Sequence, residues 1–158
     1  METFQEHPGV GPGGPRPEVT AALTRGALRL FLDLGLSPLT EFRLPNGRRA
    51  DVAALDPKGR LVFAEIKSSR EDFEADGKWP DYLGFCDAFY FVVDEAFPKA
   101  LLPNEEGLII ADAFGGAVVR QAPSRPLAPA RRKALTLRFA RIAASRLVQG
   151  TDVAVEAI

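Results

Sequence analysis

Two acidic residues and a lysine on neighbouring predicted strands form the pattern with the clearest chemical meaning in the sequence. Thirteen residues separate Asp51 from Glu65-Ile66-Lys67, and Asp56-Pro57-Lys58-Gly59 lies between two apolar runs. Proline at the second and glycine at the fourth position of that segment predict the turn of a β-hairpin. Because side chains alternate along a strand, Glu65 and Lys67 share one face, and Asp51 lies close to them across the ladder. Converging carboxylates beside a lysine indicate a site for a small, hard cation with a charge-stabilising group.

A second interpretation of the same three residues needs no ligand. Asp51, Glu65 and Lys67 would then form an ion-paired group that closes the end of a sheet. The spacing alone does not separate the two interpretations, because acid–acid–lysine triplets occur by chance in many proteins.

The surrounding sequence predicts the elements that position this hairpin. Apolar residues recur at helical spacing between Pro17 and Gly35, where the helix ends. After Lys67, the pattern Ser68-x-x-Glu71 is a capping box that starts a second helix, which Gly77 interrupts. The predicted order is a helix over 17–34, a strand over 39–44, the two hairpin strands, the helix after Ser68, strands over 88–93, 108–111 and 117–120, and a final helix over about 130–148.

This order predicts an α/β domain of three layers. The run over 88–93 is nearly all apolar, as in a parallel strand reached through a helical crossover. We therefore expect a central mixed β-sheet flanked by helices on both faces, with the hairpin near its centre. We also expect a flexible Pro/Gly-rich tail over 1–16, a single domain over 17–150 and a short tail over 151–158.

The acid–acid–lysine pattern resembles the core motif of the PD-(D/E)XK nuclease superfamily, whose members have the restriction-endonuclease-like fold. Its continuation, from Ser68-Ser69 through Lys78-Trp79-Pro80-Asp81-Tyr82 to Cys86-Asp87-Ala88-Phe89-Tyr90-Phe91, is similar to the bacterial MmcB family of DNA-repair proteins. The resemblance covers about residues 17–112. One departure is Ala50, which stands where the motif name has proline, at a position known to vary. The resemblance implies an αβββαβ core and a metal-dependent DNA nuclease.

The chemistry of phosphodiester hydrolysis explains why such residues are needed. A divalent cation neutralises the charge of the transition state and lowers the pKa of a bound water. Magnesium keeps several waters, so one or two carboxylates suffice to hold it. The resemblance implies that Asp51 and Glu65, with the backbone carbonyl of Ile66, hold Mg²⁺ (or Mn²⁺). Lys67 would orient or help to deprotonate the attacking water, or stabilise the developing charge.

Residues outside the motif are candidates for supporting roles. Glu18 lies in the first turn of the first predicted helix, where it complements the positive helix end or, as the resemblance implies, helps to hold the metal. Lys78 is expected to complete the catalytic group from the helix after the motif strand, and Tyr82 to face the DNA. Arg48 and Arg49 precede the Asp51 strand and are candidate phosphate contacts or ordinary exposed arginines of a turn.

Charge is unevenly distributed along the chain. Residues 1–112 hold 12 Lys and Arg against 19 Asp and Glu, whereas residues 113–151 hold eight basic residues and no acid. An acidic body with a basic C-terminal quarter suits a metal-binding core with a polyanion-binding surface, and Arg138 and Arg141 are its candidate DNA contacts. A solvated basic face that binds nothing is the alternative.

Composition narrows the class of protein. Hydrophobic residues make up 46% and charged residues 26% of 158 residues, as in ordinary globular proteins. Cys86 is the only cysteine, which excludes an intramolecular disulfide, and His7 is the only histidine, which argues against histidine-based catalysis and zinc sites. The sequence shows neither a secretory signal nor an apolar run of membrane-spanning length, so we expect a cytoplasmic protein with no membrane partner.

The sequence thus predicts a magnesium-dependent deoxyribonuclease that acts in DNA repair, with DNA and other DNA-repair proteins as partners. A catalytically silent DNA-binding or scaffold member of the same fold is the alternative. A small-molecule enzyme with a lone acid–lysine site is disfavoured, because the sequence has no Gly-rich phosphate loop and no nucleotide fingerprint.

Overall fold

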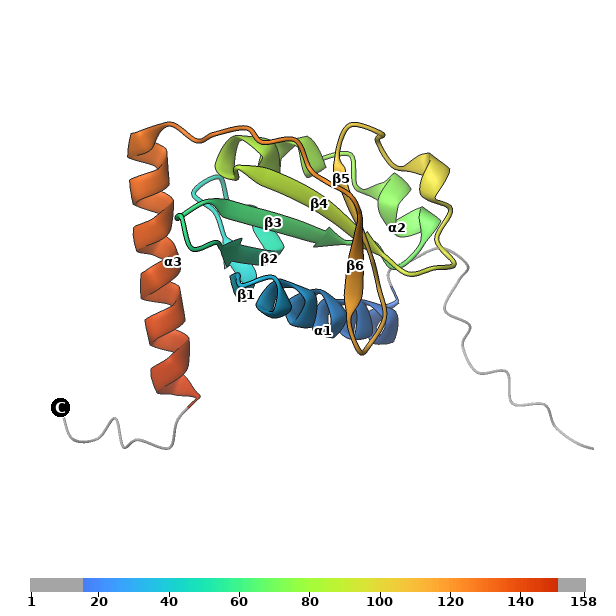
Figure 1. Ribbon diagram of the computed structural model, residues 1–158, viewed down its shortest axis with the longest axis horizontal. Coiled ribbons are helices and arrows are strands. Elements are labelled where there is room, and N and C mark those ends of the chain that lie inside the picture. Colours follow the sequence, from blue (N-terminus) through green and yellow to red (C-terminus); the bar gives the residue numbers. More distant parts are fainter. Residues whose placement is uncertain (1–15, 151–158) are drawn as a thin grey trace, which may run out of the picture.

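The computed structural model describes residues 16–150, so the two predicted tails, apart from Arg16, lie outside the described residues. Figure 1 shows the arrangement of the elements. In chain order they are α1 (Pro17–Asp33), β1 (Ser37–Arg43), β2 (Arg49–Leu55), β3 (Leu61–Ile66), α2 (Arg70–Ala75), the 3-10 helix η1 (Trp79–Phe85), β4 (Ala88–Val93), the 3-10 helix η2 (Lys99–Leu101), β5 (Gly107–Ala111), β6 (Gly116–Arg120) and α3 (Pro129–Gln149). The predicted order of helices and strands is confirmed.

The strands form a six-stranded mixed sheet in the order β1-β2-β3-β4-β5-β6. The pairs β3–β4 and β4–β5 are parallel and the other pairs are antiparallel. The hairpin of β2 and β3 therefore lies near the centre of the sheet, and α2 and η1 provide the predicted crossover to β4. Gly59 closes the hairpin turn, because its amide donates to the Asp56 carbonyl at 3.0 Å. Its φ of 81° is a conformation that glycine adopts without steric cost.

Helices cover both faces of the sheet, which confirms the predicted three-layer α/β architecture. The apolar face of α1 packs on one side of the sheet, and η1, α2 and α3 lie on the other. The second side holds an aromatic core of Phe42, Phe63, Phe89 and Phe91. Fully burying a side chain of this kind contributes about 1.5–3 kcal/mol to folding.

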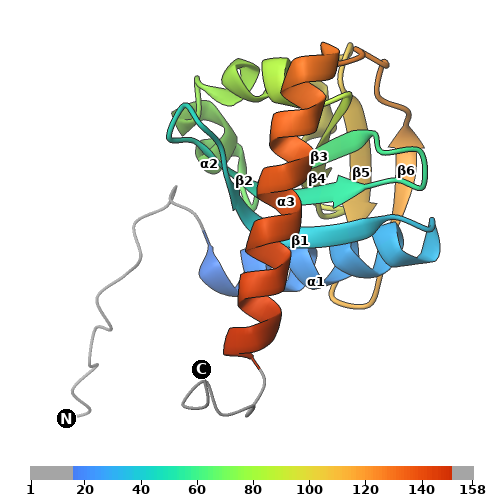
Figure 2. The same cartoon turned by 90° about the vertical axis from the view of Figure 1, so that its left-hand side faces the viewer.

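The helix α3 crosses the strands instead of running along them, as Figure 2 shows. Leu135 and Phe139 are its buried residues, and the Phe139 ring lies 5.8 Å from that of Phe42. No helix within residues 16–150 is both long and apolar enough to span a membrane.

The first turn of α3 is fixed to the sheet by an ion pair. Arg132 donates to both carboxylate oxygens of Asp87, which precedes β4 and is 2% exposed. The same carboxylate accepts the amides of Leu61 and Leu127, at 2.7 and 3.1 Å. Burial alone would raise the pKa of Asp87, but these hydrogen bonds and the charge of Arg132 lower it. Asp87 therefore joins β3, β4 and α3.

The edge strand β1 is irregular next to the central hairpin. In its register with β2, the position of Glu41 is opposite Asp51, but the two residues do not form a regular pair. Glu41 has a φ of 50°, a left-handed conformation that is unfavourable for a residue with a side chain. Arg146 of α3 donates to the carbonyls of Thr40 and Glu41. The helix α3 thus holds the backbone of β1 in this conformation.

The helix α2 starts one residue later than predicted. Its N-cap is Ser69, whose hydroxyl accepts the amide of Asp72 at 3.1 Å. The capping box expected from Ser68 to Glu71 is therefore wrong. The Asp72 carboxylate instead accepts the amide and the hydroxyl of Ser68, at 2.9 and 3.2 Å. The helix ends before Gly77, as expected.

Candidate functional site

The central hairpin brings Asp51 and Glu65 together on one face of the sheet, and we refer to them as the carboxyl pair. The antiparallel register of β2 with β3 places them opposite each other, one position beyond the last regular pair. The Asp51 amide donates to Glu65 Oε1 at 2.9 Å, and the Ile66 amide donates to Asp51 Oδ2 at 2.8 Å. Each carboxyl group is thus held by a backbone amide of the opposing strand. The two acids thus lie opposite each other, as the hairpin pairing predicted, whereas their sharing of a metal stays a prediction.

Burial of the carboxyl pair changes its acid–base behaviour. Glu65 is 5% exposed. Burial, followed by the charge of Asp51, raises the pKa of Glu65 to about 9. Burial also raises the pKa of Asp51, against the opposing effects of the Ile66 amide and of the Lys67 charge. Because two adjacent carboxylates, one buried and one half-buried, repel each other, the pair retains a proton near neutral pH when no cation is bound.

Lys67 lies on the same face as the carboxyl pair, but its ion pair is with another acid. The lysine is 5% exposed, and its Nζ lies 2.6 Å from Asp76 Oδ2. Burial alone would raise the pKa of Asp76, but the hydrogen bond from Lys67 and that from the Lys78 amide lower it. The ion pair of Lys67 is therefore with the segment after α2. The charge of Lys67 also acts on Asp51 and Glu65, but the three residues do not form the ion-paired group of the second interpretation.

The 3-10 helix η1 forms the outer wall of the site. Tyr82 is 7% exposed, and its hydroxyl donates to the carbonyl of Arg49 at 3.0 Å. Burial, and then the charge of Glu65, raises the pKa of Tyr82, so its phenol stays protonated. On the solvent side, Arg48 pairs with Asp81 at 3.3 Å. The structure thus places Tyr82 in the buried wall of the site and Arg48 at its rim, while Arg49 is exposed.

The remaining predicted site residues lie further out. The amide of Arg16 donates to the Ser68 hydroxyl at 3.0 Å, so α1 begins beside the end of β3. Glu18 in its first turn is exposed and lines a separate hollow with Asp94 and Glu95. Within residues 16–150 no three Asp, Glu, His or Cys side chains are grouped closely enough to hold a metal ion. The structure therefore does not bring Glu18 to the carboxyl pair.

Lys78 reaches the site through its backbone. Its amide donates to Asp76 Oδ1 at 3.0 Å, whereas its side chain is exposed. The neighbouring Trp79 stacks on Phe89 with ring centroids 5.8 Å apart, which makes it a core residue. Lys78 thus helps to orient the acid that holds Lys67.

Sequence reasoning missed Asp76 and Asp72, which shape the site. Asp76 holds Lys67, and the charge of Asp72 is among the causes that raise the pKa of Asp51. A local signal for Asp76 exists, because an aspartate side chain that accepts the amide two residues later forms an Asx turn. That signal predicts the turn at Gly77, but it does not predict the contact with Lys67.

The basic C-terminal quarter contains arginines that are neutralised inside the protein. Arg125 forms two hydrogen bonds with the Glu106 carboxylate, at 3.0 and 2.9 Å. Arg132 is paired with Asp87, as described above. These two arginines stabilise the connection to α3, so the charge count along the sequence overstates the charge available to a ligand.

The candidate DNA contacts of α3 remain positively charged at the surface. Arg138 donates to the neutral carbonyl of Arg43 at 3.3 Å, and Arg141 is exposed. Neither forms an ion pair with a carboxylate of residues 16–150. Both are therefore available to an anionic ligand.

The comparisons with known proteins identify the family. The profile of the family described as DNA repair protein MmcB-like matches residues 10–154. A solved structure, the SPO1766 protein of unknown function from Silicibacter pomeroyi, is 46% identical in sequence and superposes with a TM-score of 0.78. The match covers 84% of this chain and 94% of that protein. A search of curated proteins gave no match. The chain therefore belongs to the MmcB-like family of DNA repair proteins.

Proposed function

We propose that this protein is a metal-dependent DNA nuclease of the PD-(D/E)XK type that acts in DNA repair. The observation that carries the proposal is the carboxyl pair, the buried Glu65 and the half-buried Asp51 held opposite each other at the end of the central hairpin with Lys67 on the same face. The name of the family supports a role in DNA repair and contact with DNA. Other DNA-repair proteins are further candidate partners.

The order of elements around the pair also supports the proposal. A helix, three antiparallel strands, a helical crossover and a parallel strand follow one another. The paired acids stand on the second and third strands, and the lysine directly follows the third. This is the arrangement that the resemblance to the PD-(D/E)XK superfamily implies.

The donor set of the carboxyl pair fits Mg²⁺ or Mn²⁺. Two carboxylates are hard oxygen ligands, and the backbone carbonyl of Ile66 is the third candidate. The proton that the buried pair retains would be released on binding, since a divalent cation removes the repulsion between Asp51 and Glu65. When bound, such an ion supplies charge neutralisation at the phosphoryl group and a water of lowered pKa.

The protein's own residues would then divide the remaining work. The two backbone amides keep the carboxyl pair oriented, so the site is formed before substrate arrives. Lys67, with Asp76 fixing its position, would place a positive charge beside the reacting phosphate. Arg48 at the rim would exchange Asp81 for a neighbouring phosphate, and Tyr82, whose hydroxyl donates to the Arg49 carbonyl, would hold the start of β2 beside the site instead of contacting the DNA as expected.

A catalytically silent DNA-binding or scaffold protein is the second candidate. The observation that favours it is the ion pair of Lys67 with Asp76, because a lysine held by a carboxylate is less available to a phosphate. The two functions differ in one respect: only the nuclease consumes DNA in a metal-dependent reaction.

A cleavage assay separates the two. Labelled single-stranded, duplex and branched DNA would be incubated with the purified protein in Mg²⁺, in Mn²⁺ or in EDTA. We expect metal-dependent cleavage by the wild type, and loss of cleavage in Asp51→Asn and Glu65→Gln with the fold intact. Glu74→Gln, an exposed position on α2, is the matched control and should cut normally. Binding without cleavage of any substrate would establish the silent alternative, and equal cleavage by all variants would place the activity elsewhere.

A further inference from the structure

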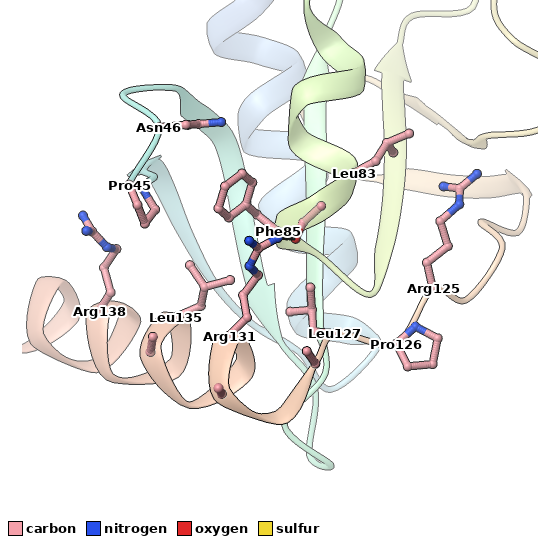
Figure 3. Close-up of a pocket in the computed structure, with 14 residues that line it drawn as sticks. Pro45, Asn46, Leu83, Phe85, Arg125, Pro126, Leu127, Arg131, Leu135 and Arg138 are labelled. Carbon is pink, nitrogen blue, oxygen red and sulfur yellow. Dashed lines mark hydrogen bonds between the residues drawn. The ribbon is translucent and has the colours of Figure 1, made fainter.

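A groove runs along one side of α3, as the close-up in Figure 3 shows for its larger part. That part has a volume of about 1040 Å³ and lies between α3, η1 and the turn before β2. A second hollow of about 490 Å³ continues along α3 and shares Ala134 and Arg138 with the first. Together they follow α3 from residue 130 to residue 146, a length of about 24 Å at 1.5 Å per residue. We call this hollow the α3 groove.

The α3 groove combines an apolar floor with a positively charged edge. Leu83, Phe85, Leu127 and Leu135 line its larger part, and no acidic residue lines either part among the described residues. Arginines occur along its whole length, at positions 125, 131, 138, 141 and 146. A ligand that fits such a surface is anionic and presents flat or apolar groups between its charges.

The arginines of the groove are held in place without being neutralised. Arg131 donates to the carbonyl of Gly84 at 2.8 Å, and its guanidinium lies 4.8 Å from the centre of the Phe85 ring. Arg138 and Arg146 likewise donate to backbone carbonyls. A carbonyl is a neutral partner, so each guanidinium keeps its full charge and unused N–H donors. Among the groove arginines, Arg125 differs, because Glu106 neutralises it.

The α3 groove and the carboxyl pair share two walls. Tyr82 of η1 lies beside the carboxyl pair, and Asp81 pairs with Arg48 at the rim, whereas Leu83, Gly84 and Phe85 of the same element line the groove. The turn at Pro45 and Asn46 lines the groove, and Arg48, whose amide donates to Asn46 Oδ1 at 2.9 Å, lies at the rim of the site. The same two elements therefore form a wall of the groove and a wall of the site, although Arg48 at the rim is paired with Asp81.

We propose that the α3 groove binds a single strand of DNA and guides it towards the carboxyl pair. The phosphates would contact Arg131, Arg138 and Arg141, and the faces of unpaired bases would pack on the apolar floor. A duplex gains little from such a floor, because its base faces are hidden in the stack. Charge complementarity requires an anionic ligand, and the apolar floor and the walls shared with the carboxyl pair favour a nucleic acid over an acidic peptide. The inference rests on the proposed function for the meaning of those shared walls.

Binding to a labelled single strand tests the proposal. The probe is a fluorescein-labelled oligothymidylate of about 12 nucleotides, longer than the roughly seven nucleotides that 24 Å would hold at most, at the 3.4 Å rise of a strand in a duplex. Fluorescence anisotropy would be measured in EDTA across a salt series, with a duplex of the same length and polyglutamate as competitors. The variants are Arg138→Ala with Arg141→Ala, and as a matched control Arg25→Ala with Lys133→Ala, which removes the same charge from exposed positions outside the groove.

The proposal predicts that the groove variant binds the single strand about tenfold more weakly than wild type. It also predicts a salt slope lower by about 1.4, or about 0.7 for each lost phosphate contact. The control should bind as the wild type does, and the single strand should compete better than duplex or polyglutamate. Because Arg138 also holds Arg43, Arg141→Ala alone is the second variant, and it should lower the slope by about 0.7.

Several results would overturn the proposal: equal affinity and slope in groove and control variants, tighter binding of duplex, or displacement by polyglutamate at lower concentration than by DNA. The assay contains no metal, so it does not depend on cleavage. A wild type that binds through the groove but never cuts would leave this inference standing and end the nuclease proposal. If the wild type, the groove variant and the control variant all cut DNA and bind it equally well, the groove proposal alone would end.

Discussion

Lys67 Nζ lies 2.6 Å from Asp76 Oδ2, and this ion pair ties the end of β3 to the turn after α2. The lysine side chain is 6% exposed and the aspartate 24%. Only the outer part of the pair therefore meets solvent, and the lysine depends on Asp76 for compensation of its charge. In the proposed nuclease, the position of the Lys67 ammonium is set by a residue outside the acid–acid–lysine motif.

Replacing Asp76 should affect both stability and activity. We expect Asp76→Asn to lower the free energy of unfolding by about 2 kcal/mol, less than for a fully buried pair because Asp76 is partly exposed. We also expect kcat for metal-dependent cleavage to fall with little change in KM, and Asp76→Glu to restore part of it. Urea unfolding and steady-state kinetics measure the two effects.

Glu74→Gln provides the comparison for that variant. It removes an exposed i,i+4 pair with Arg70 on the same short helix. Its effect on stability should stay within about 0.5 kcal/mol. If Asp76→Asn changed the free energy of unfolding no more than this control and left kcat unchanged, Asp76 would have no role in positioning Lys67.

The carboxyl pair predicts an unusual dependence of stability on pH in the absence of metal. The pKa of Glu65 rises from 4.5 to about 9 on folding, chiefly through burial. Between these values the unfolded chain releases a proton that the folded protein retains, so the stability contributed by this group falls as pH rises from about 5 to 9. Asp56, Asp76 and Asp87 have lowered pKa values and titrate below this window.

Thermal melts in EDTA across that pH range measure this effect. Glu65→Gln resembles the protonated acid and cannot ionise, so its melting temperature should depend less on pH and should exceed that of the wild type near pH 8. A wild type whose melting temperature rises steadily from pH 5 to 9 in EDTA would show that the pair is ionised and compensated within the protein.

The packing of α1 against the turn between β5 and β6 depends on a glycine. A Cβ at Gly26 would lie 1.9 Å from the Asp112 carbonyl oxygen and 2.6 Å from that of Gly115. Because both are backbone atoms, Gly26→Ala should destabilise the protein by about 3 kcal/mol, despite the higher helix propensity of alanine. Gly77→Ala meets no atom within 4 Å and should be nearly neutral. Equal stability of the two variants in urea unfolding would contradict this helix–turn contact.

The ion pair at the start of α3 should be the most sensitive polar contact outside the site. Asp87→Asn leaves the Arg132 charge without its carboxylate and weakens the hydrogen bonds from Leu61 and Leu127. We expect a loss of about 3–5 kcal/mol, measured by urea unfolding. Lys133→Ala, the next residue along α3 with an exposed side chain, should change stability by less than about 0.5 kcal/mol. If Asp87→Asn lowered the free energy of unfolding no more than Lys133→Ala does, the ion pair would contribute little to holding α3 on the sheet.

The fold could largely be predicted from the sequence because its signals are local. Three signals each depend on a few consecutive residues: the alternation in β2 and β3, the turn at Gly59 and the apolar run of β4. The same alternation placed Glu65 and Lys67 on one face of the sheet, with Asp51 on that face of the neighbouring strand. Even the cap of α2 was misplaced by only one residue, since Ser68 and Ser69 are equivalent as sequence signals and only the folded backbone selects between them.

Contacts between distant segments could not be predicted in the same way. Lys67 meets Asp76 only because α2 turns back over the end of β3, and Arg132 meets Asp87 across 45 residues. A count of basic residues after position 112 does not reveal that carboxylates neutralise Arg125 and Arg132 while carbonyls hold Arg131 and Arg138. The paired and unpaired arginines are distinguished by tertiary structure alone.

The central claim is that the carboxyl pair holds a divalent metal, and thermal melts of wild type and Glu65→Gln with and without Mg²⁺ test it most directly. A ligand present at 100 times its Kd stabilises the folded state by about 2.7 kcal/mol. We predict that Mg²⁺ raises the melting temperature of the wild type and leaves that of Glu65→Gln unchanged, while the variant in EDTA is at least as stable as the wild type. A wild type that Mg²⁺ and Mn²⁺ leave unchanged, together with a strongly destabilised Glu65→Gln, would show that the carboxyl pair is a structural feature and contradict the claim.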